Sequence, residues 1–134
     1  LYSAWGIHDI PEAIDRLAAE RIPVVISLAR AMNLAFVSSY ADYPLHQIYD
    51  ADVPLVIGAG MPTFYQTTLT DQYRLIVEEC GFELQELEEM ALNAVRYSFL
   101  PDEEKQTLLA DFEAQYQTLR DEHLSNAGEG DGVE

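Results

Sequence analysis

The sequence is poor in basic residues. Seven lysine and arginine side chains stand against 24 aspartate and glutamate side chains, and the formal net charge is -17 at pH 7. Nucleic acids and anionic membranes bind proteins mainly through lysine and arginine, because these side chains neutralise phosphates. The scarcity of basic residues therefore argues against a nucleic-acid-binding module and against binding to an anionic membrane. We interpret the acidic excess as a solubility feature in preference to an acidic docking surface.

Cysteine and long apolar runs are also scarce. Cys80 is the one cysteine, so an internal disulfide is excluded, and its apolar context is typical of a buried thiol. No run is long and apolar enough to span a bilayer. The first residues, LYSAWGIHDI, lack the basic region and the continuous apolar core of a signal peptide. We therefore expect a cytoplasmic protein.

The composition is otherwise that of a folded protein. Hydrophobic residues make up 49% of the 134 residues, which is enough to bury a core in one domain. We expect that domain to cover residues 1–124. The last ten residues, SNAGEGDGVE, are polar, acidic and glycine-rich, and this composition predicts a disordered tail over 125–134.

The first half of the chain predicts parallel βα units. Residues 23–28 and 53–57 are rich in β-branched residues and apolar on both faces, as in parallel strands covered on both sides, and residues 1–5 resemble part of a third strand. Helices are expected over 11–21, with Asp9 as the N-cap, and over 44–50. Strands alternating with helices indicate an α/β fold with right-handed βα connections.

The second half of the chain predicts helices. Thr70 is the expected N-cap of a helix over 71–80, and Gly81 its stop. Apolar residues at three- and four-residue spacing predict a further helix over 83–97. Pro101 then breaks the chain, and an acidic first turn opens a last helix at residue 102.

The segment LVIGAGMPTF, residues 55–64, follows a predicted strand at the place where α/β proteins carry their chemistry. Its glycines do not complete a dinucleotide-binding motif, and Pro62 removes a backbone N–H that a phosphate would need. Elsewhere, we interpret three groups of polar residues as structural. The histidines, His8, His46 and His123, are interpreted as surface or capping residues, and Ser38 and Ser39 as ordinary loop hydroxyls. The carboxylates of Glu83, Glu86, Glu88 and Glu89 are interpreted as part of a solvated helix face. The residues alone thus predict neither a catalytic residue nor a metal ligand.

Several short sequence motifs nevertheless resemble the carboxyl-terminal part of adenosine deaminase-like metal-dependent hydrolases. The motifs are Tyr-Pro-Leu at 43–45, Asp-Ala-Asp-Val-Pro at 50–54, Thr-Leu-Thr-Asp-Gln-Tyr at 68–73, Asn-Ala-Val at 93–95 and Ser-Phe-Leu at 98–100. The resemblance covers about residues 1–124 and rests on the order and spacing of these motifs along the chain as well as on the motifs themselves. It implies the last three βα units of a (β/α)8 barrel followed by terminal helices.

The resemblance also implies what the strand ends should carry. Members of this family hold a zinc ion that activates water for deamination, and their last strand ends in Ser-Asp-Asp-Pro, whose first aspartate binds the metal. Here the same place reads Ala59-Gly60-Met61-Pro62. The Gly-His-Gly expected after the earliest of the three strands is Ala4-Trp5-Gly6, and the Pro-Thr-Ser-Asn motif after the next is Leu-Ala-Arg-Ala at 28–31. Such side chains do not ligate zinc, so no metal ligand is carried over.

These departures lead to a functional hypothesis. We expect a non-catalytic, adenosine deaminase-like fragment or pseudoenzyme, natural or engineered, with a structural or interaction role and no cofactor. One alternative is a subunit or piece of a zinc-dependent adenosine or purine nucleoside deaminase whose catalytic residues and zinc ligands lie on another chain or on a missing segment. A second alternative is a purine-binding module without chemistry. The residues of its vestigial pocket would be Trp5, Tyr43, Gly58, Gly60, Met61 and Phe64.

Three parallel strands cannot close a barrel and leave strand edges unpaired. We therefore expect self-association, a second protein chain that completes the sheet, or a rearrangement into a smaller sandwich. In that rearrangement the apolar segment 29–42 would form a covering helix.

Overall fold

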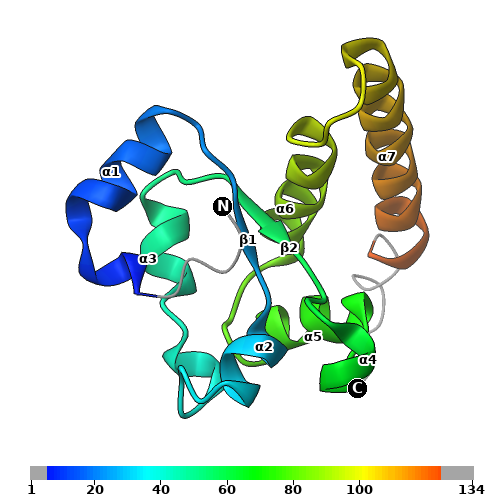
Figure 1. Cartoon of the computed structure of the whole chain (residues 1–134). Helices are drawn as coiled ribbons and strands as arrows, with labels where there is room; N and C mark the ends of the chain where they lie inside the picture. The colour runs from blue at the N-terminus through cyan, green and yellow to red at the C-terminus, as the bar shows by residue number, and fades with distance from the viewer. Residues whose placement is uncertain (1–5, 125–134) are drawn as a thin grey trace, which may run out of the picture. The chain divides into compact units, whose positions relative to one another are not determined.

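A computed structural model describes residues 6–124 of the chain (Figure 1). The elements are η1 (Ile7–Asp9), α1 (Pro11–Ala19), β1 (Val24–Ile26), α2 (Leu28–Asn33), η2 (Tyr40–Asp42), α3 (Leu45–Asp50), β2 (Leu55–Ile57), α4 (Pro62–Tyr65), α5 (Leu69–Glu78), α6 (Leu84–Arg96) and α7 (Asp102–His123). The predicted α/β class, with βα units followed by helices, is confirmed. The third strand predicted at 1–5 and the tail predicted at 125–134 lie outside the described residues.

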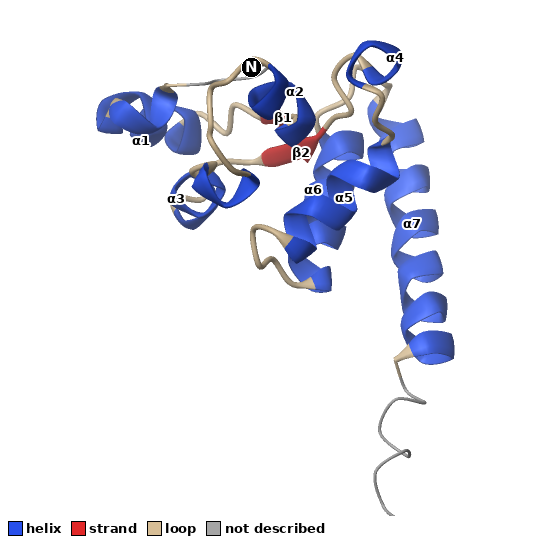
Figure 2. Cartoon of the chain, turned by 90° about the horizontal axis from the view of Figure 1, so that it is seen from below, coloured by secondary structure: helices blue, strands red, loops and turns tan. Residues whose placement is uncertain are grey.

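The chain divides into two compact units, Leu1–Ala94 and Val95–Glu134. The first contains both strands, which lie in the middle of this unit (Figure 2). The second contains the end of α6 and the whole of α7, whose acidic first turn and basic last turn suit the helix dipole.

The two strands are parallel and pair Val24 with Leu55, Val25 with Val56 and Ile26 with Ile57. Because side chains alternate along a strand, the two faces of this sheet differ. Val24, Ile26, Leu55 and Ile57 lie on one face and belong to the hydrophobic core, each at most 6% exposed. Val25 and Val56, on the other face, are half-buried.

Helices α1, α3, α5 and α6 contribute to this core through one apolar stripe each. The buried residues are Ile14 and Leu17, Leu45 and Ile48, Ile76, and Leu87 and Met90, in that order of helices. Leu45, Ile76 and Met90 are completely buried. The core therefore joins the two βα units to the helices that follow them.

The prediction of a covering helix over residues 29–42 is wrong. The structure has a helix only at Leu28–Asn33 and a short 3-10 turn at Tyr40–Asp42. Ala35 adopts a left-handed conformation with φ 54°, which a continuous right-handed helix does not allow.

Two predicted helix caps are also wrong. The N-cap of α1 is Ile10, without a side-chain hydrogen bond, and Pro11 supplies the preset φ of the first turn. The N-cap of α5 is Thr68, two residues before the predicted Thr70. Thr68 and Asp71 form a capping box in which each side chain accepts a hydrogen bond from the other's backbone N–H.

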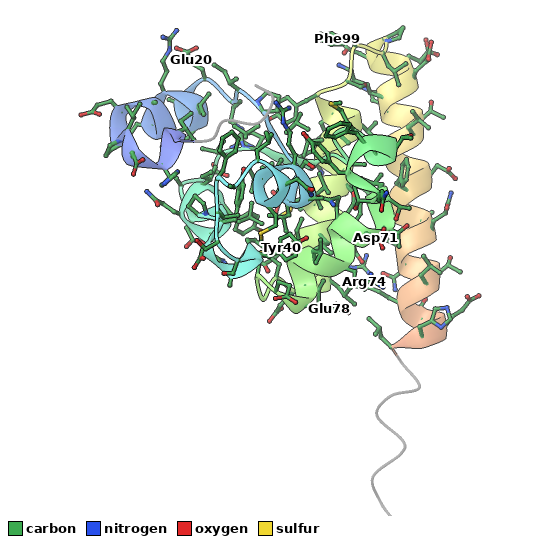
Figure 3. The ribbon with its side chains drawn as sticks, turned by 60° about the horizontal axis from the view of Figure 1, so that its bottom comes forward. Glu20, Tyr40, Asp71, Arg74, Glu78 and Phe99 are labelled. Carbon is green, nitrogen blue, oxygen red and sulfur yellow. The ribbon has the colours of Figure 1, made fainter. Side chains whose placement is uncertain are left out.

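The predicted stop of α5 at Gly81 is confirmed. Gly81 has φ 75° and donates its N–H to Val77, while Phe82 donates to Ile76. The bond from Gly81 to Val77 is the single bond of the αL C-cap motif, and the buried side chains of Ile76 and Phe82 belong to the hydrophobic core. On the surface of α5, Arg74 lies between Asp71 and Glu78, with N–O distances of 3.1 and 3.8 Å (Figure 3).

Candidate functional site

The carboxyl ends of β1 and β2 lie at one edge of the sheet because the strands are parallel. After β1 the chain turns at Ser27, which is 5% exposed and whose hydroxyl accepts a hydrogen bond from the N–H of Arg30. After β2 it runs through Gly58 to the four-residue helix α4. We call the segments at this edge the carboxyl rim, consisting of residues 27–31, which include the start of α2, and residues 58–66, which include α4.

Gly58 allows the rim to approach β1 closely. A Cβ atom on Gly58 would lie 2.9 Å from Cγ1 of Val25, well inside van der Waals contact. The backbone of the rim is therefore packed directly against the half-buried face of the neighbouring strand.

A buried amide links the rim to α5. Gln72 is completely buried; its side-chain oxygen accepts a hydrogen bond from the N–H of Ala29 at 3.2 Å, and its nitrogen donates to the hydroxyl of Thr67 at 2.9 Å. Sequence reasoning missed this residue, because glutamine is mostly exposed in folded proteins. The signal available was its spacing of four residues from Ile76, which places both side chains on the buried face of α5.

Four of the six predicted pocket residues lie on one segment of the chain. Gly58, Gly60, Met61 and Phe64 lie on the rim after β2, where Met61 is 52% and Phe64 is 71% exposed. The ring of Phe64 packs edge-on against Tyr65, with centroids 5.0 Å apart. Tyr43 is part of the hydrophobic core, and burial raises the pKa of its hydroxyl to about 12. Trp5 lies outside the described residues.

The side chains of the rim do not fit a zinc site. Zinc in proteins binds imidazole, thiolate and carboxylate groups. The rim carries hydroxyl, amide, thioether, aromatic and aliphatic side chains and Arg30. Over residues 6–124 there is no group of three or more histidine, cysteine, aspartate or glutamate residues that could hold a metal ion.

His46 and His123 are exposed, whereas His8 is half-buried, with its Nε2 atom 3.5 Å from a carboxylate oxygen of Asp9. His46, on α3, lies with its Nε2 atom 2.8 Å from the carbonyl of Cys80, beyond the end of α5. Its ring also stacks on Phe82, with centroids 4.1 Å apart. His46 therefore ties α3 to the turn after α5.

A second polar region lies at the opposite end of β2. A hollow of about 300 Å3 is lined by Arg21, Tyr49, Asp50, Asp52, Val53, Pro54, Glu89 and Asn93, and we call it the amino-end hollow. Arg21 donates to the carboxylate and the carbonyl of Asp52 at 2.8 and 2.9 Å. Asn93, which is 5% exposed, donates to the carbonyl of Leu55.

Tyr49 contributes a hydroxyl to this hollow and donates it to Glu89 at 3.2 Å. Desolvation, reinforced by the negative charge of Glu89, raises the pKa of Tyr49 to about 12. The hydroxyl is therefore neutral at physiological pH and serves as a hydrogen-bond donor, not as a base.

The elements described include no helix that is both long and apolar enough to cross a membrane. The rim offers a short apolar and aromatic surface, and the amino-end hollow offers carboxylates and hydrogen-bonding groups.

The chain is similar to deaminases in sequence. It is 29% identical over 111 residues to the adenosine deaminase of Streptococcus mutans, which covers 83% of this chain and 32% of that protein. It is 34% identical over 100 residues to a putative adenosine/adenine deaminase of Streptomyces coelicolor, covering 75% of this chain and 29% of that protein. The chain thus spans about a third of the length of these relatives.

The same likeness extends to the fold. The crystal structure of adenine deaminase from Arthrobacter aurescens superposes with a TM-score of 0.82 at 22% identity, over 87% of this chain and 36% of that one. The fold is consistent with part of such a barrel together with the helices that follow it. A sequence profile described as adenosine deaminase matches residues 6–115. The chain therefore belongs to the adenosine deaminase family.

Proposed function

We propose that the chain is a non-catalytic member of the adenosine deaminase family with a structural or interaction role. The observation that supports this proposal is the chemistry of the carboxyl rim. Gly60 and Met61 occupy the place where the family resemblance leads us to expect two aspartates, and the rim offers no zinc-binding set. On this proposal the chain binds no metal and performs no hydrolysis by itself.

The proposed role requires a partner. Over residues 6–124 the parallel sheet has two strands, which is far fewer than in the closed barrel from which such βα units come. A strand at the edge of a sheet presents backbone groups that can pair with another chain. We propose that the chain associates with itself or with a second protein chain that completes the sheet, in the cytoplasm.

Native mass spectrometry tests this proposal, because one spectrum reports the number of subunits and any bound mass. It is paired with an adenosine and adenine deamination assay on the same sample after addition of zinc. The proposal expects a protein without zinc and without turnover. One zinc per chain together with turnover by the chain alone would contradict it.

The first alternative is a piece of an active deaminase. The observation in its favour is coverage, since the relatives are about three times longer than the stretch that matches. This alternative expects the chain to co-purify with a polypeptide that carries the remaining strands, and zinc and turnover to be present only in that complex.

The second alternative is a purine-binding module without chemistry, which the exposed Phe64 favours. An exposed aromatic ring provides a surface on which a base can stack. If this alternative holds, adenosine or inosine raises the melting temperature of the chain, and Phe64→Ser removes the increase. Phe99→Ser is the matched control, because Phe99 is also exposed but lies in the other unit.

A further inference from the structure

The turn between α6 and α7 carries the most exposed of the described phenylalanine and tyrosine side chains. Phe99 is fully exposed, and Figure 3 shows it on the turn that leads into α7. The ring of Phe64 packs on Tyr65 and the ring of Phe112 on Tyr116, whereas the described part of the chain gives the ring of Phe99 no partner. An apolar ring left in water adds no hydrophobic stabilisation to the fold. The side chain of Phe99 is therefore available to a pocket on another protein.

The backbone of this turn is held by local hydrogen bonds. Residues 97–101 lie between the end of α6 and the start of α7. Within them, Ser98 donates its N–H and its hydroxyl to the carbonyl of Val95, and Leu100 donates its N–H to the hydroxyl of Ser98 at 3.4 Å. These bonds join residues at most three positions apart. They can therefore open without disturbing a distant segment of the chain.

A peptide bond in such a turn suits the way in which proteases bind their substrates. A protease holds the chain on both sides of the bond as an extended strand, through backbone hydrogen bonds. A helix does not offer these bonds, because its backbone groups are already paired with each other. Exposed loop tips are accordingly the preferred sites at which folded proteins are cut. Phe99 lies in the middle of the turn, with two residues of the turn on each side.

The side chains of the turn favour one bond and one class of protease. An aromatic ring just before the bond fills the hydrophobic pocket of a chymotrypsin-like enzyme. Leu100 is also apolar and 38% exposed, but the bond after it includes the nitrogen of Pro101, which is fixed in a ring and has no N–H. Tyr97 is half-buried next to the end of α6. The bond between Phe99 and Leu100 is therefore the favoured one.

A cut at this bond leaves the hydrophobic core in one piece. The first compact unit ends at Ala94, and the buried residues of the core cluster all lie between Ile14 and Met90. The product that ends at Phe99 thus keeps both strands and the helices α1 to α6, and the other product contains α7. Because burial of the core supplies most of the stability of a fold, we expect the larger product to stay folded.

We propose that the turn at 97–101 is a processing site, where a protease with a pocket for an aromatic ring hydrolyses the peptide bond between Phe99 and Leu100. The bond from the carbonyl carbon of Phe99 to the nitrogen of Leu100 breaks. Water supplies the hydroxyl of the new carboxyl group at Phe99 and the proton of the new amino group at Leu100, and no oxidant or reductant is consumed. This processing separates α7 from the part of the chain that contains the strands, and it goes beyond the proposed non-catalytic role.

Limited digestion of the full chain with chymotrypsin, followed by mass spectrometry of the intact products, tests this proposal. We expect one early cut that yields residues 1–99 and 100–134, with the larger product resistant to further digestion. Phe99→Ser should slow this cut about tenfold or more, because it removes the ring that fills the pocket of the enzyme. Phe64→Ser is the matched control, because Phe64 is also strongly exposed but lies on α4. It should change the rate of the cut less than about twofold.

A second variant tests whether the turn itself is accessible, whatever side chain it carries. Phe99→Arg should direct an early cut by trypsin, whose pocket accepts a basic side chain, to the same bond, which the product masses identify. A first chymotrypsin cut elsewhere, an equal rate in Phe99→Ser, or no trypsin cut after residue 99 in Phe99→Arg would overturn the proposal. Rapid degradation of the 1–99 product would overturn it as well. The digestion uses neither zinc nor a nucleoside, so its outcome is independent of whether the chain is catalytic.

Discussion

The side chain of Gln72 accepts a hydrogen bond from the backbone N–H of Ala29, 43 residues away along the chain. Both residues are buried, and the same glutamine donates to Thr67. One amide group thus joins the first turn of α2 to α5 and to the loop that precedes α5. The order of the carboxyl rim depends on this bridge as much as on apolar packing.

Removal of this bridge should destabilise the protein strongly. We expect Gln72→Ala to lower the free energy of unfolding by about 2 to 4 kcal/mol, because it leaves the N–H of Ala29 buried without its acceptor and opens a cavity. Urea unfolding followed by circular dichroism measures the change. Gln117→Ala on the exposed surface of α7 is the control, expected within about 0.5 kcal/mol of the unaltered chain.

The position of the α5 cap is tested by two neighbouring threonines. Thr68→Ala should cost about 1 kcal/mol in unfolding free energy, because it removes the acceptor for the N–H of Asp71. Thr70→Ala, two residues later, should cost much less because the structure gives Thr70 no capping role. Equal losses in the two variants would show that the capping box does not form as described.

Asp71 should make this cap sensitive to acid. Hydrogen bonds from the side chain and backbone of Thr68 lower the pKa of Asp71 below its ordinary value. A lowered pKa in the folded state means that the contribution to stability is present above the unfolded-state pKa and is lost as the pH falls through the folded-state value. Asp71→Asn should therefore reduce stability at pH 7, and its difference from the unaltered chain should shrink below about pH 4.

Thermal unfolding at a series of pH values measures that difference. Asp15→Asn on α1 is the control, because Asp15 is exposed and outside any cap. A difference between Asp71→Asn and the unaltered chain that stays constant from pH 7 to pH 3 would contradict the assigned role of the carboxylate.

The close approach at Gly58 should be visible in a double-mutant cycle. Gly58→Ala places a methyl group 2.9 Å from Cγ1 of Val25 and should cost about 1 to 3 kcal/mol. Val25→Ala removes that γ-carbon, so the double variant should be less destabilised than the sum of the two single variants. Additive effects in urea unfolding would mean that the clash is relieved elsewhere.

Burial of Tyr43 should appear in an alkaline titration. Desolvation raises its pKa to about 12, so its ionisation should lag behind that of exposed tyrosines near pH 10. Because the folded-state pKa is raised, the associated stability is complete below about pH 10 and is lost as the pH rises towards 12. The ultraviolet absorbance of tyrosinate measures this. The pKa of Tyr49 is also raised to about 12, so Tyr43→Phe should reduce the amplitude of the late-titrating step without removing it. An unchanged amplitude of that step in Tyr43→Phe would contradict the prediction.

The position of the carboxyl rim in the sequence was predictable, but the contacts that its residues make were not. The rim at residues 58–64 was located from an apolar run that ends in glycines, and the structure puts a strand end there. The packing of Gly58 against Val25 and the burial of Gln72 were not predictable, because both depend on residues 33 and 43 positions away. The helix expected across 29–42 failed because its apolar composition carries no sign of the left-handed turn at Ala35.

The sequence alone determined the parallel βα order and the helical character of the second half, because these follow from local patterns of apolar and helix-capping residues. The order and spacing of short sequence motifs also indicated the family. Only the tertiary structure decided that Arg21 meets Asp52 and that Gln72 faces Ala29. Such contacts join segments distant in the chain, and their energy comes from burial and hydrogen bonding that no local pattern encodes.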